Sequence, residues 1–213
     1  MTREALEWFA LIVSVPLVAG YELRLARAAR RNPATTARSA HSVLRSEWVK
    51  ALSRQPGSEL LAVQALRNSL MSATINASTA ALALMGSTGL LAKSVGATVL
   101  SPRFALELTL ALTLFAAYVC SASAMRYYHH ASFALSLPVG SPERRARSEL
   151  AVNYVQRAGI LYSWSLRCFL FLAPIVVGLL EPLMTPLAAA GLLFVLSLFD
   201  RAPKYAGDTV ASD

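Results

Sequence analysis

The stretch FALELTLALTLFAAYVCSASAM, residues 104–125, decides the fold class, because it is long and apolar and has Glu107 as its one charged residue. Hydrocarbon offers a peptide group no hydrogen-bonding partner, so a block of this length predicts an α-helix that crosses a bilayer. Further apolar blocks cover residues 5–23, 70–92, 158–180 and 183–199. The sequence therefore predicts an all-α, polytopic membrane protein with about five transmembrane helices.

The composition supports one membrane domain. Of the 213 residues, 55% are hydrophobic and only 15% are charged, which is too apolar for an ordinary soluble domain. We expect a single transmembrane helical domain over residues 1–200 and a short cytoplasmic tail over residues 201–213. The formal net charge is +8, but the basic residues flank the apolar blocks, so membrane topology explains them better than nucleic-acid binding. No cleavable signal peptide is recognised, and we expect the first span to be retained.

Basic residues alternate between rich and poor gaps. The gap after the first block contains Arg24, Arg27, Arg30, Arg31, Arg38, Arg45, Lys50 and Arg54. The gap after the second block has only Lys93 and Arg103, whereas the next is rich again, with Arg126, Arg144, Arg145, Arg147 and Arg157. Because cytoplasmic loops carry the excess of Lys and Arg, this pattern predicts an outside N-terminus and a cytoplasmic C-terminus. The membrane we expect is the bacterial inner (plasma) membrane.

The fourth and fifth blocks are separated only by Glu181 and Pro182. The fifth block is the shortest, at about 26 Å of helix, which still crosses a typical hydrocarbon core. We expect a tight helical hairpin at this point rather than one bent helix.

Three helices are expected to be longer than the bilayer requires. Ser58, Ser101 and Ser141 are candidate N-caps, the last two being followed by proline, and each helix would be about 50 Å long. Since the hydrocarbon is only about 30 Å thick, the excess predicts cytoplasmic helical extensions over residues 59–69, 126–137 and 142–157.

A short amphipathic helix is predicted over residues 42–54. One face would carry Val43, Leu44, Trp48 and Leu52, and the opposite face Arg45, Lys50 and Arg54. Such a helix is expected to lie on the inner leaflet or against the extensions.

One segment carries a family resemblance. Trp48-Val49, the stretch LAVQALRNSLMSAT over residues 61–74 and Ala77-Ser78-Thr79 resemble the DUF599 family of uncharacterised membrane proteins from bacteria and plants. The similarity extends through Met125-Arg126-Tyr127 to Phe199-Asp200. It implies a multi-span helical membrane protein and no particular activity, substrate or catalytic residue.

The second apolar block carries a polar stripe at helical spacing. Its members are Gln64, Asn68, Ser72, Asn76 and Thr79, followed by the small residues Ala83 and Gly86. One interpretation is helix packing, since small and hydroxylated residues let membrane helices approach closely. The other is a hydrated path, because Asn76 is costly in lipid without a partner. Thr109 and Thr113 of the third block are candidates for the opposing wall.

Several basic residues are candidate sites. Arg167 is predicted within the hydrocarbon depth, where it either pairs structurally with helix carbonyls or stripe amides or attracts anions. Glu107 is expected near the outer end, where water could solvate it, and at a different depth from Arg167. The extensions contain Arg67, Arg126, His130 and Arg157. These residues predict either a basic vestibule or attraction to anionic inner-leaflet lipids.

Catalytic motifs are missing from the sequence, which contains no GxSxG, HExxH or P-loop pattern. Cys120 and Cys168 lie in apolar blocks without metal-ligand spacing. We therefore expect no enzyme activity, no metal and no cofactor, with a haem held by two of the three histidines as the remaining cofactor alternative.

The favoured function is a non-enzymatic, homo-oligomeric channel or carrier with some anion bias. The alternative is a structural or accessory subunit of a larger membrane complex. The expected partners are the lipid bilayer and either further copies of the chain or other membrane subunits, and no nucleic acid.

Overall fold

The computed structural model describes residues 2–32, 36–94 and 101–201. Within them the chain forms six α-helices and one short 3₁₀ helix. Their bounds are α1 Arg3–Arg31, α2 Ala37–Leu52, α3 Glu59–Ser94, α4 Pro102–Ser136, α5 Pro142–Leu180, η2 Pro182–Met184 and α6 Thr185–Phe199. Five helical segments are long and apolar enough to cross a membrane, so the all-α, five-span prediction is confirmed. Most of the predicted tail, residues 202–213, lies outside the described residues.

The long helices begin largely where capping chemistry predicts. The side-chain oxygens of Ser101 and Ser141 accept hydrogen bonds from backbone N–H groups three residues further on, at 3.2 and 3.1 Å. Proline occupies the next position in both helices, where a missing N–H costs nothing. Ser58 directly precedes α3, as predicted, and its backbone carbonyl accepts from the N–H of Ala62 at 3.0 Å, but its hydroxyl donates to the carbonyl oxygen of Leu52 at 2.7 Å. It therefore fixes the turn between α2 and α3.

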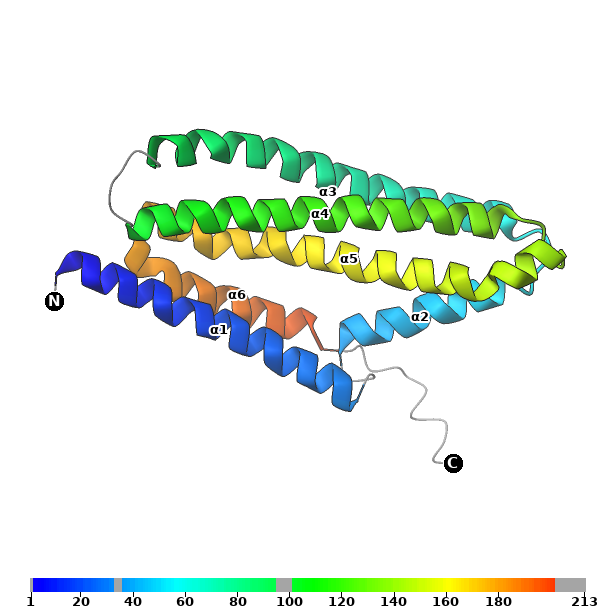
Figure 1. Cartoon of the computed structure of the whole chain (residues 1–213). Coiled ribbons are helices and arrows are strands. Elements are labelled where there is room, and N and C mark those ends of the chain that lie inside the picture. Colours follow the sequence, from blue (N-terminus) through cyan, green and yellow to red (C-terminus); the bar gives the residue numbers. More distant parts are fainter. Residues whose placement is uncertain (1, 33–35, 95–100, 202–213) are drawn as a thin grey trace, which may run out of the picture.

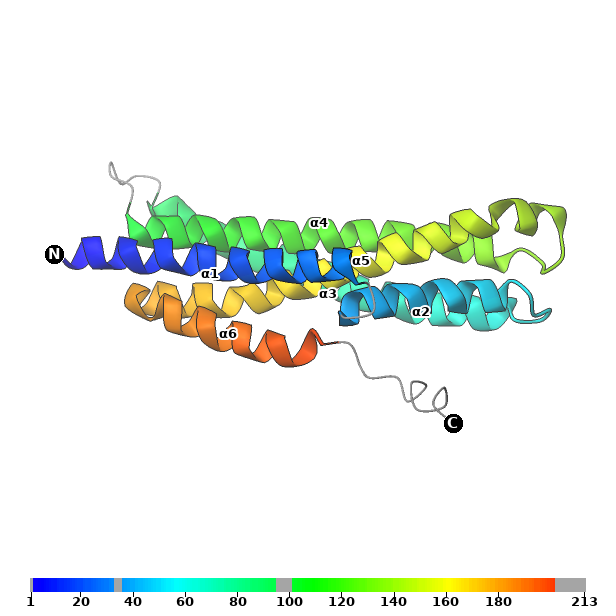
Figure 2. The same ribbon diagram turned by 90° about the horizontal axis from the view of Figure 1, so that it is seen from below.

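The helices form an elongated bundle in which α3, α4 and α5 lie side by side (Figure 1). α3 is at one edge, and α1 and α6 lie at the opposite edge. The three long helices continue past α1 and α6 at the end where α2 packs, as the view from below also shows (Figure 2). We call this end the extension side. The predicted excess length is therefore present, and it projects in one direction.

The extensions are held together by a core rich in alanine, which lets the helices approach closely. Its buried members are Val49 and Leu52 from α2, Ala62, Leu66 and Ala73 from α3, Ala124, Tyr128, Ala131, Ala134 and Leu135 from α4, and Ala151, Val155 and Ala158 from α5. The amphipathic α2 therefore packs on the extensions, which was one of its two predicted locations.

The buried face of α2 differs from the predicted one. Val43 and Leu44 remain about half exposed, at 49% and 51%, while Val49 is fully buried. Arg45 was expected on the polar face, but its guanidinium packs directly against the backbone of α5 at Gly159. A Cβ added to this glycine would lie only 2.4 Å from the guanidinium carbon. The long apolar stem of an arginine can pack in this way, and the glycine leaves the space for it.

Arg144 closes the tip of the extension side. Its side chain is 2% exposed and donates to the carbonyl oxygens of Ala134 and Leu137, at 3.1 and 3.3 Å. These carbonyls belong to the end of α4, so the arginine satisfies acceptors that the helix cannot satisfy itself. Glu59 stabilises the same turn by accepting the N–H of Val139 at 2.7 Å.

The α5–α6 connection is a tight hairpin, as predicted. α5 ends at Leu180, Glu181 is extended, and η2 leads directly into α6. The two helices approach closely at Gly178, because an added Cβ there would lie 2.4 Å from Oγ1 of Thr185. This hairpin returns the chain to the Arg167 region, where α6 ends.

Candidate functional site

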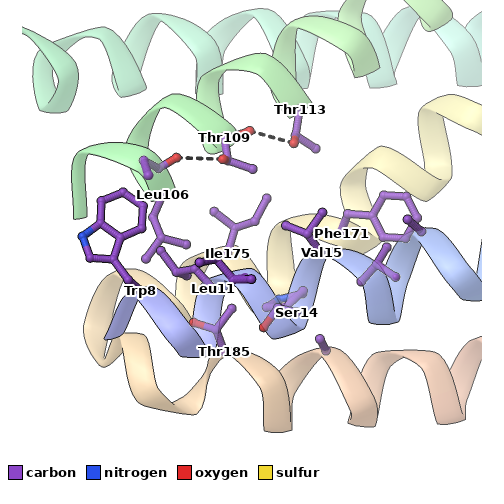
Figure 3. A pocket seen from close by; sticks show the side chains of 16 residues that line it. Trp8, Leu11, Ser14, Val15, Leu106, Thr109, Thr113, Phe171, Ile175 and Thr185 are labelled. Atoms are coloured by element: carbon purple, nitrogen blue, oxygen red, sulfur yellow. Dashed lines mark hydrogen bonds between the residues drawn. The ribbon is translucent and has the colours of Figure 1, made fainter. Parts of the chain in front are cut away.

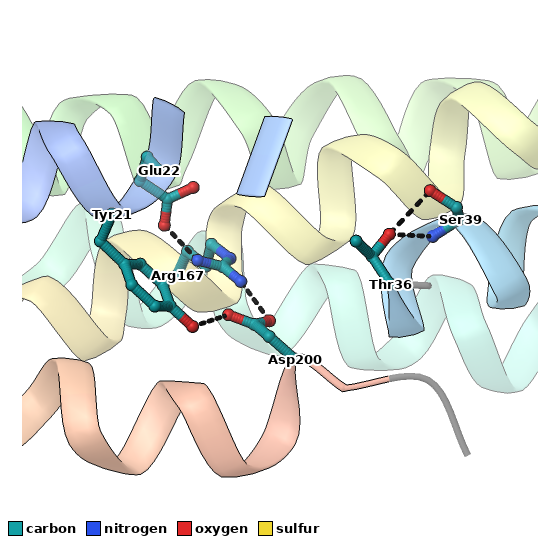
Figure 4. Close-up of polar contacts among 6 residues, drawn as sticks. All are labelled: Tyr21, Glu22, Thr36, Ser39, Arg167 and Asp200. Carbon is teal, nitrogen blue, oxygen red and sulfur yellow. Dashed lines mark hydrogen bonds and ion pairs between the residues drawn. The ribbon is translucent and has the colours of Figure 1, made fainter. Parts of the chain in front are cut away.

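Arg167 is the centre of a buried ionic cluster (Figure 4). Its guanidinium, on α5, forms ion pairs with Glu22 of α1 and with Asp200, the C-cap residue of α6. The hydroxyl of Tyr21 donates to the second carboxylate oxygen of Asp200 at 2.7 Å. The arginine side chain is 6% exposed, and those of Glu22 and Asp200 are 17% and 16% exposed. We call Tyr21, Glu22, Arg167 and Asp200 the Arg167 cluster.

The cluster also fixes where α2 begins. The backbone N–H of Ala37 donates to the carbonyl oxygen of Asp200 at 3.1 Å, and Thr36 forms an isolated backbone bridge with Arg201. Thr36 then caps α2, its side-chain oxygen accepting from the N–H of Ser39 at 3.4 Å. Four helices therefore meet at one point, which lies at the C-terminal end of α6.

Arg38 brings a second cation close to the cluster. Its guanidinium carbon lies 4.6 Å from the ring centroid of Trp164 on α5, which is cation–π geometry. Burial lowers the pKa of Arg38, the positive charge of Arg167 lowers it further, and the carboxylates of Glu22 and Asp200 oppose this shift. An arginine remains charged under such a perturbation. Two cations thus face two carboxylates, so the region is close to neutral overall.

These contacts change the interpretation of Arg167. The sequence suggested helix carbonyls or stripe amides as structural partners, whereas the partners are two carboxylates. Glu107, which was expected to be solvated, is 3% exposed at the opposite end of the bundle. Ser94 donates to it at 2.5 Å and Arg103 pairs with it at 3.3 Å, because the ends of α3 and α4 close over it.

The polar stripe on α3 faces away from the rest of the chain. We call Gln64, Asn68, Ser72, Asn76 and Thr79 the α3 polar face; all are exposed except Asn76, which is half-buried. α3 packs on α4 through the opposite side, using Ala73, Ala77 and Ala80. The amide nitrogen of Asn76 is buried and has no hydrogen-bond partner among the described residues.

Thr109 and Thr113 do not lie opposite the α3 polar face. They line a pocket of about 490 Å³ together with residues of α1, α5 and α6 (Figure 3). Both hydroxyls donate to carbonyl oxygens of their own helix at 2.7 Å, and Ser14 and Thr185, in the same wall, also donate to backbone carbonyls. The four hydroxyls are therefore already satisfied, and the rest of the lining is largely apolar.

The four basic residues of the extensions that the sequence singled out are all exposed, namely Arg67, Arg126, His130 and Arg157. Two of them form one patch. Arg157 donates to the hydroxyl of Tyr127 at 3.5 Å, and the ring of His130 lies 5.6 Å from that of Tyr154. For Arg67 and Arg126, the described residues provide no hydrogen-bonding or ionic partner. These side chains remain accessible to solutes or headgroups.

The comparison with family models agrees with the resemblance seen in the sequence. Residues 9–205 match the model described as protein of unknown function, DUF599. The chain belongs to the DUF599 family. No curated protein and no solved structure matches it. The family match includes the whole Arg167 cluster and the whole α3 polar face.

Sequence reasoning missed Glu22 and Asp200 as functional candidates. Each stands next to an aromatic residue at the end of an apolar block, Tyr21 and Phe199 respectively. Carboxylates in such positions, together with an arginine inside another block, are a signal that could have suggested the pairing. The described residues contain no group of three His, Cys, Asp or Glu side chains placed to hold a metal ion.

Proposed function

We propose that this protein is a non-enzymatic, homo-oligomeric membrane channel or carrier whose conduit forms where the α3 polar faces of neighbouring copies meet. The observation that carries the proposal is the exposure of this face within a single chain. Gln64, Asn68, Ser72 and Thr79 point away from every other helix of their own copy. Part of this face belongs to the apolar span, where a monomer would present it to lipid.

Hydrogen-bonding groups are expensive in lipid unless they meet a partner or water. Ser72 reduces the cost by donating to the carbonyl oxygen of Asn68 at 3.1 Å. The amide nitrogen of Asn76 has no such partner among the described residues. That nitrogen is buried within its own chain, so a second copy or a water-filled space between copies would instead satisfy the exposed polar groups of Gln64, Asn68 and Thr79.

The continuation of this face suits close helix contact. At Gly86 and Gly89 an added Cβ would meet nothing within 4 Å, so the backbone surface is open in the single chain. Small residues on membrane helices allow neighbouring backbones to approach and pack. We infer that α3 is the helix through which copies associate.

The sidedness follows from charge. The C-terminal end of α1, the gap between α1 and α3 and the extensions together hold most of the Lys and Arg residues, so we place the extension side in the cytoplasm and the N-terminus outside. The membrane we propose is the bacterial inner membrane. The anion bias would then come from Arg67, Arg126, His130 and Arg157, since two carboxylates neutralise Arg167.

A disulfide cross-link across α3 tests the assembly. In a Cys120→Ser, Cys168→Ser background, Gly86→Cys should form a dimer on mild oxidation. The matched control is Leu187→Cys, which is 71% exposed on α6 and should remain monomeric. The intact particle in mild detergent should weigh a multiple of the 22.9 kDa chain. A monomeric particle without a cross-link would exclude the proposal.

A flux measurement tests the conduit. Liposomes containing the protein should release chloride faster than potassium, and Asn76→Leu or Thr79→Leu should reduce the release severalfold. Release that is unchanged by both substitutions would contradict an α3 conduit. A particle that contains a foreign chain bound at α3 would instead support the second candidate, an accessory subunit, because the same uncovered face suits a foreign helix.

A further inference from the structure

A groove lies between α1 and α6 in the half of the bundle toward the extension side. It has a volume of about 550 Å³. Its walls are Tyr21, Arg24, Leu25 and Ala28 from α1 and Ala190, Leu193, Phe194 and Ser197 from α6. The groove exists because the two helices diverge toward their C-terminal ends (Figures 1 and 2).

The groove combines an apolar slot with a cation. Ala190 and Leu193 belong to the apolar span of α6, so this part of the groove lies at the depth expected for hydrocarbon. Arg24 follows the last residue of the first apolar block and therefore stands where the hydrocarbon ends. Its side chain is exposed, and no carboxylate of the described residues pairs with it. The nearby Asp200 is already occupied by Arg167 and Tyr21.

The surroundings of Arg24 favour an anion. Residues 23–31 contain four arginines and no acidic residue. Their summed field attracts negative charge, and each basic residue close to an anionic membrane surface contributes about 1 kcal/mol. A ligand that fits must therefore combine a hydrocarbon chain with a negatively charged group at the membrane surface.

We propose that the α1–α6 groove binds one anionic phospholipid, with an acyl chain between the helices and the phosphate on Arg24. The site lies on the edge of the bundle opposite α3 (Figure 1), so it does not depend on the proposed channel. The lipid would fill the space where α1 and α6 separate. It would thereby hold α1 against the bundle beside the Arg167 cluster.

Native mass spectrometry of the purified full chain tests the site, with palmitoyl-oleoyl phosphatidylglycerol and phosphatidylcholine added in equal amounts. The chain should retain one phosphatidylglycerol in preference to phosphatidylcholine. Arg24→Gln should reduce that preference about fivefold, which corresponds to about 1 kcal/mol for one arginine. Arg24→Lys should keep most of it.

Two further variants separate the groove from general surface charge. Arg31→Gln removes an equal charge from the same helix outside the groove and should leave retention nearly unchanged. Ala190→Phe fills the groove without changing the charge and should reduce retention. Equal losses in Arg31→Gln and Arg24→Gln, or full retention by Ala190→Phe, would overturn the proposal. So would displacement of the lipid by inorganic phosphate at millimolar concentration, because the acyl chain would then contribute nothing.

Discussion

Replacement of Arg167 by glutamine should destabilise the protein, since it leaves two carboxylates facing each other in a mostly buried site. Removing one partner of a buried ion pair costs about 3–5 kcal/mol. Glu22 and Asp200 remain 17% and 16% exposed, so some solvation persists and the lower end, about 3 kcal/mol, applies. For a chain of this size that corresponds to a decrease in Tm of about 6–12 °C.

Arg3→Gln is the matched control. Arg3 also contacts two carboxylates, those of Glu7 and Glu181, but its side chain is 71% exposed. Water and salt screen exposed ion pairs, so they contribute little to stability, and the Tm of this variant should decrease far less than that of Arg167→Gln. The measurement is thermal unfolding in one detergent, followed by tryptophan fluorescence.

A triple variant distinguishes an uncompensated charge from a loss of packing. In Glu22→Gln, Arg167→Met, Asp200→Asn the three charges disappear together, and the asparagine can still accept the Tyr21 hydroxyl. Replacing a whole buried ionic group is often neutral, so this variant should recover most of the lost Tm. The reasoning is refuted if Arg167→Gln unfolds within 2 °C of the wild type, or if the triple variant is as unstable as the single one.

Two further predictions concern the ends of the bundle. Donation from the N–H of Val139 lowers the pKa of Glu59, so the stability that Glu59 contributes is present above its unfolded pKa and is lost as the pH falls through its folded pKa. In chemical denaturation, Glu59→Gln should therefore have a lower free energy of unfolding than the wild type at neutral pH and the same free energy of unfolding in acid. A difference in stability that persists in acid would contradict this. At the opposite end, Gly178→Ala should cost about 1–3 kcal/mol because its Cβ would meet Thr185, whereas Gly191→Ala, with open space around it, should unfold like the wild type.

The helices could be predicted because their causes are local. An apolar block in lipid must satisfy its own peptide groups, and a serine followed by proline marks a helix start wherever it occurs. The predictions for Ser101 and Ser141 were therefore right. Ser58 also precedes a helix as predicted, but the contact of its hydroxyl with Leu52 could not be predicted, because it depends on how the turn folds.

The α3 polar face was recognisable for a similar reason. Residues at helical spacing share a side of any helix, so the membership of the face follows from the sequence. The direction in which this face points within the bundle does not follow from the sequence. Only packing decided that Ala73, Ala77 and Ala80 meet α4, which leaves the polar side chains outside, and that Thr109 and Thr113 face α1 rather than α3.

By itself, the sequence determined the membrane class, the number of spans and the projecting extensions, since hydrophobicity, length and capping act over a few residues. The tertiary structure alone decided which charges neutralise one another. Glu22 lies 145 residues from Arg167 and Asp200 lies 33 residues from it, and nothing local sets either distance in space. Those pairs form because the hairpin brings the end of α6 beside α1, and because a buried guanidinium in a low-dielectric interior requires opposite charge within reach.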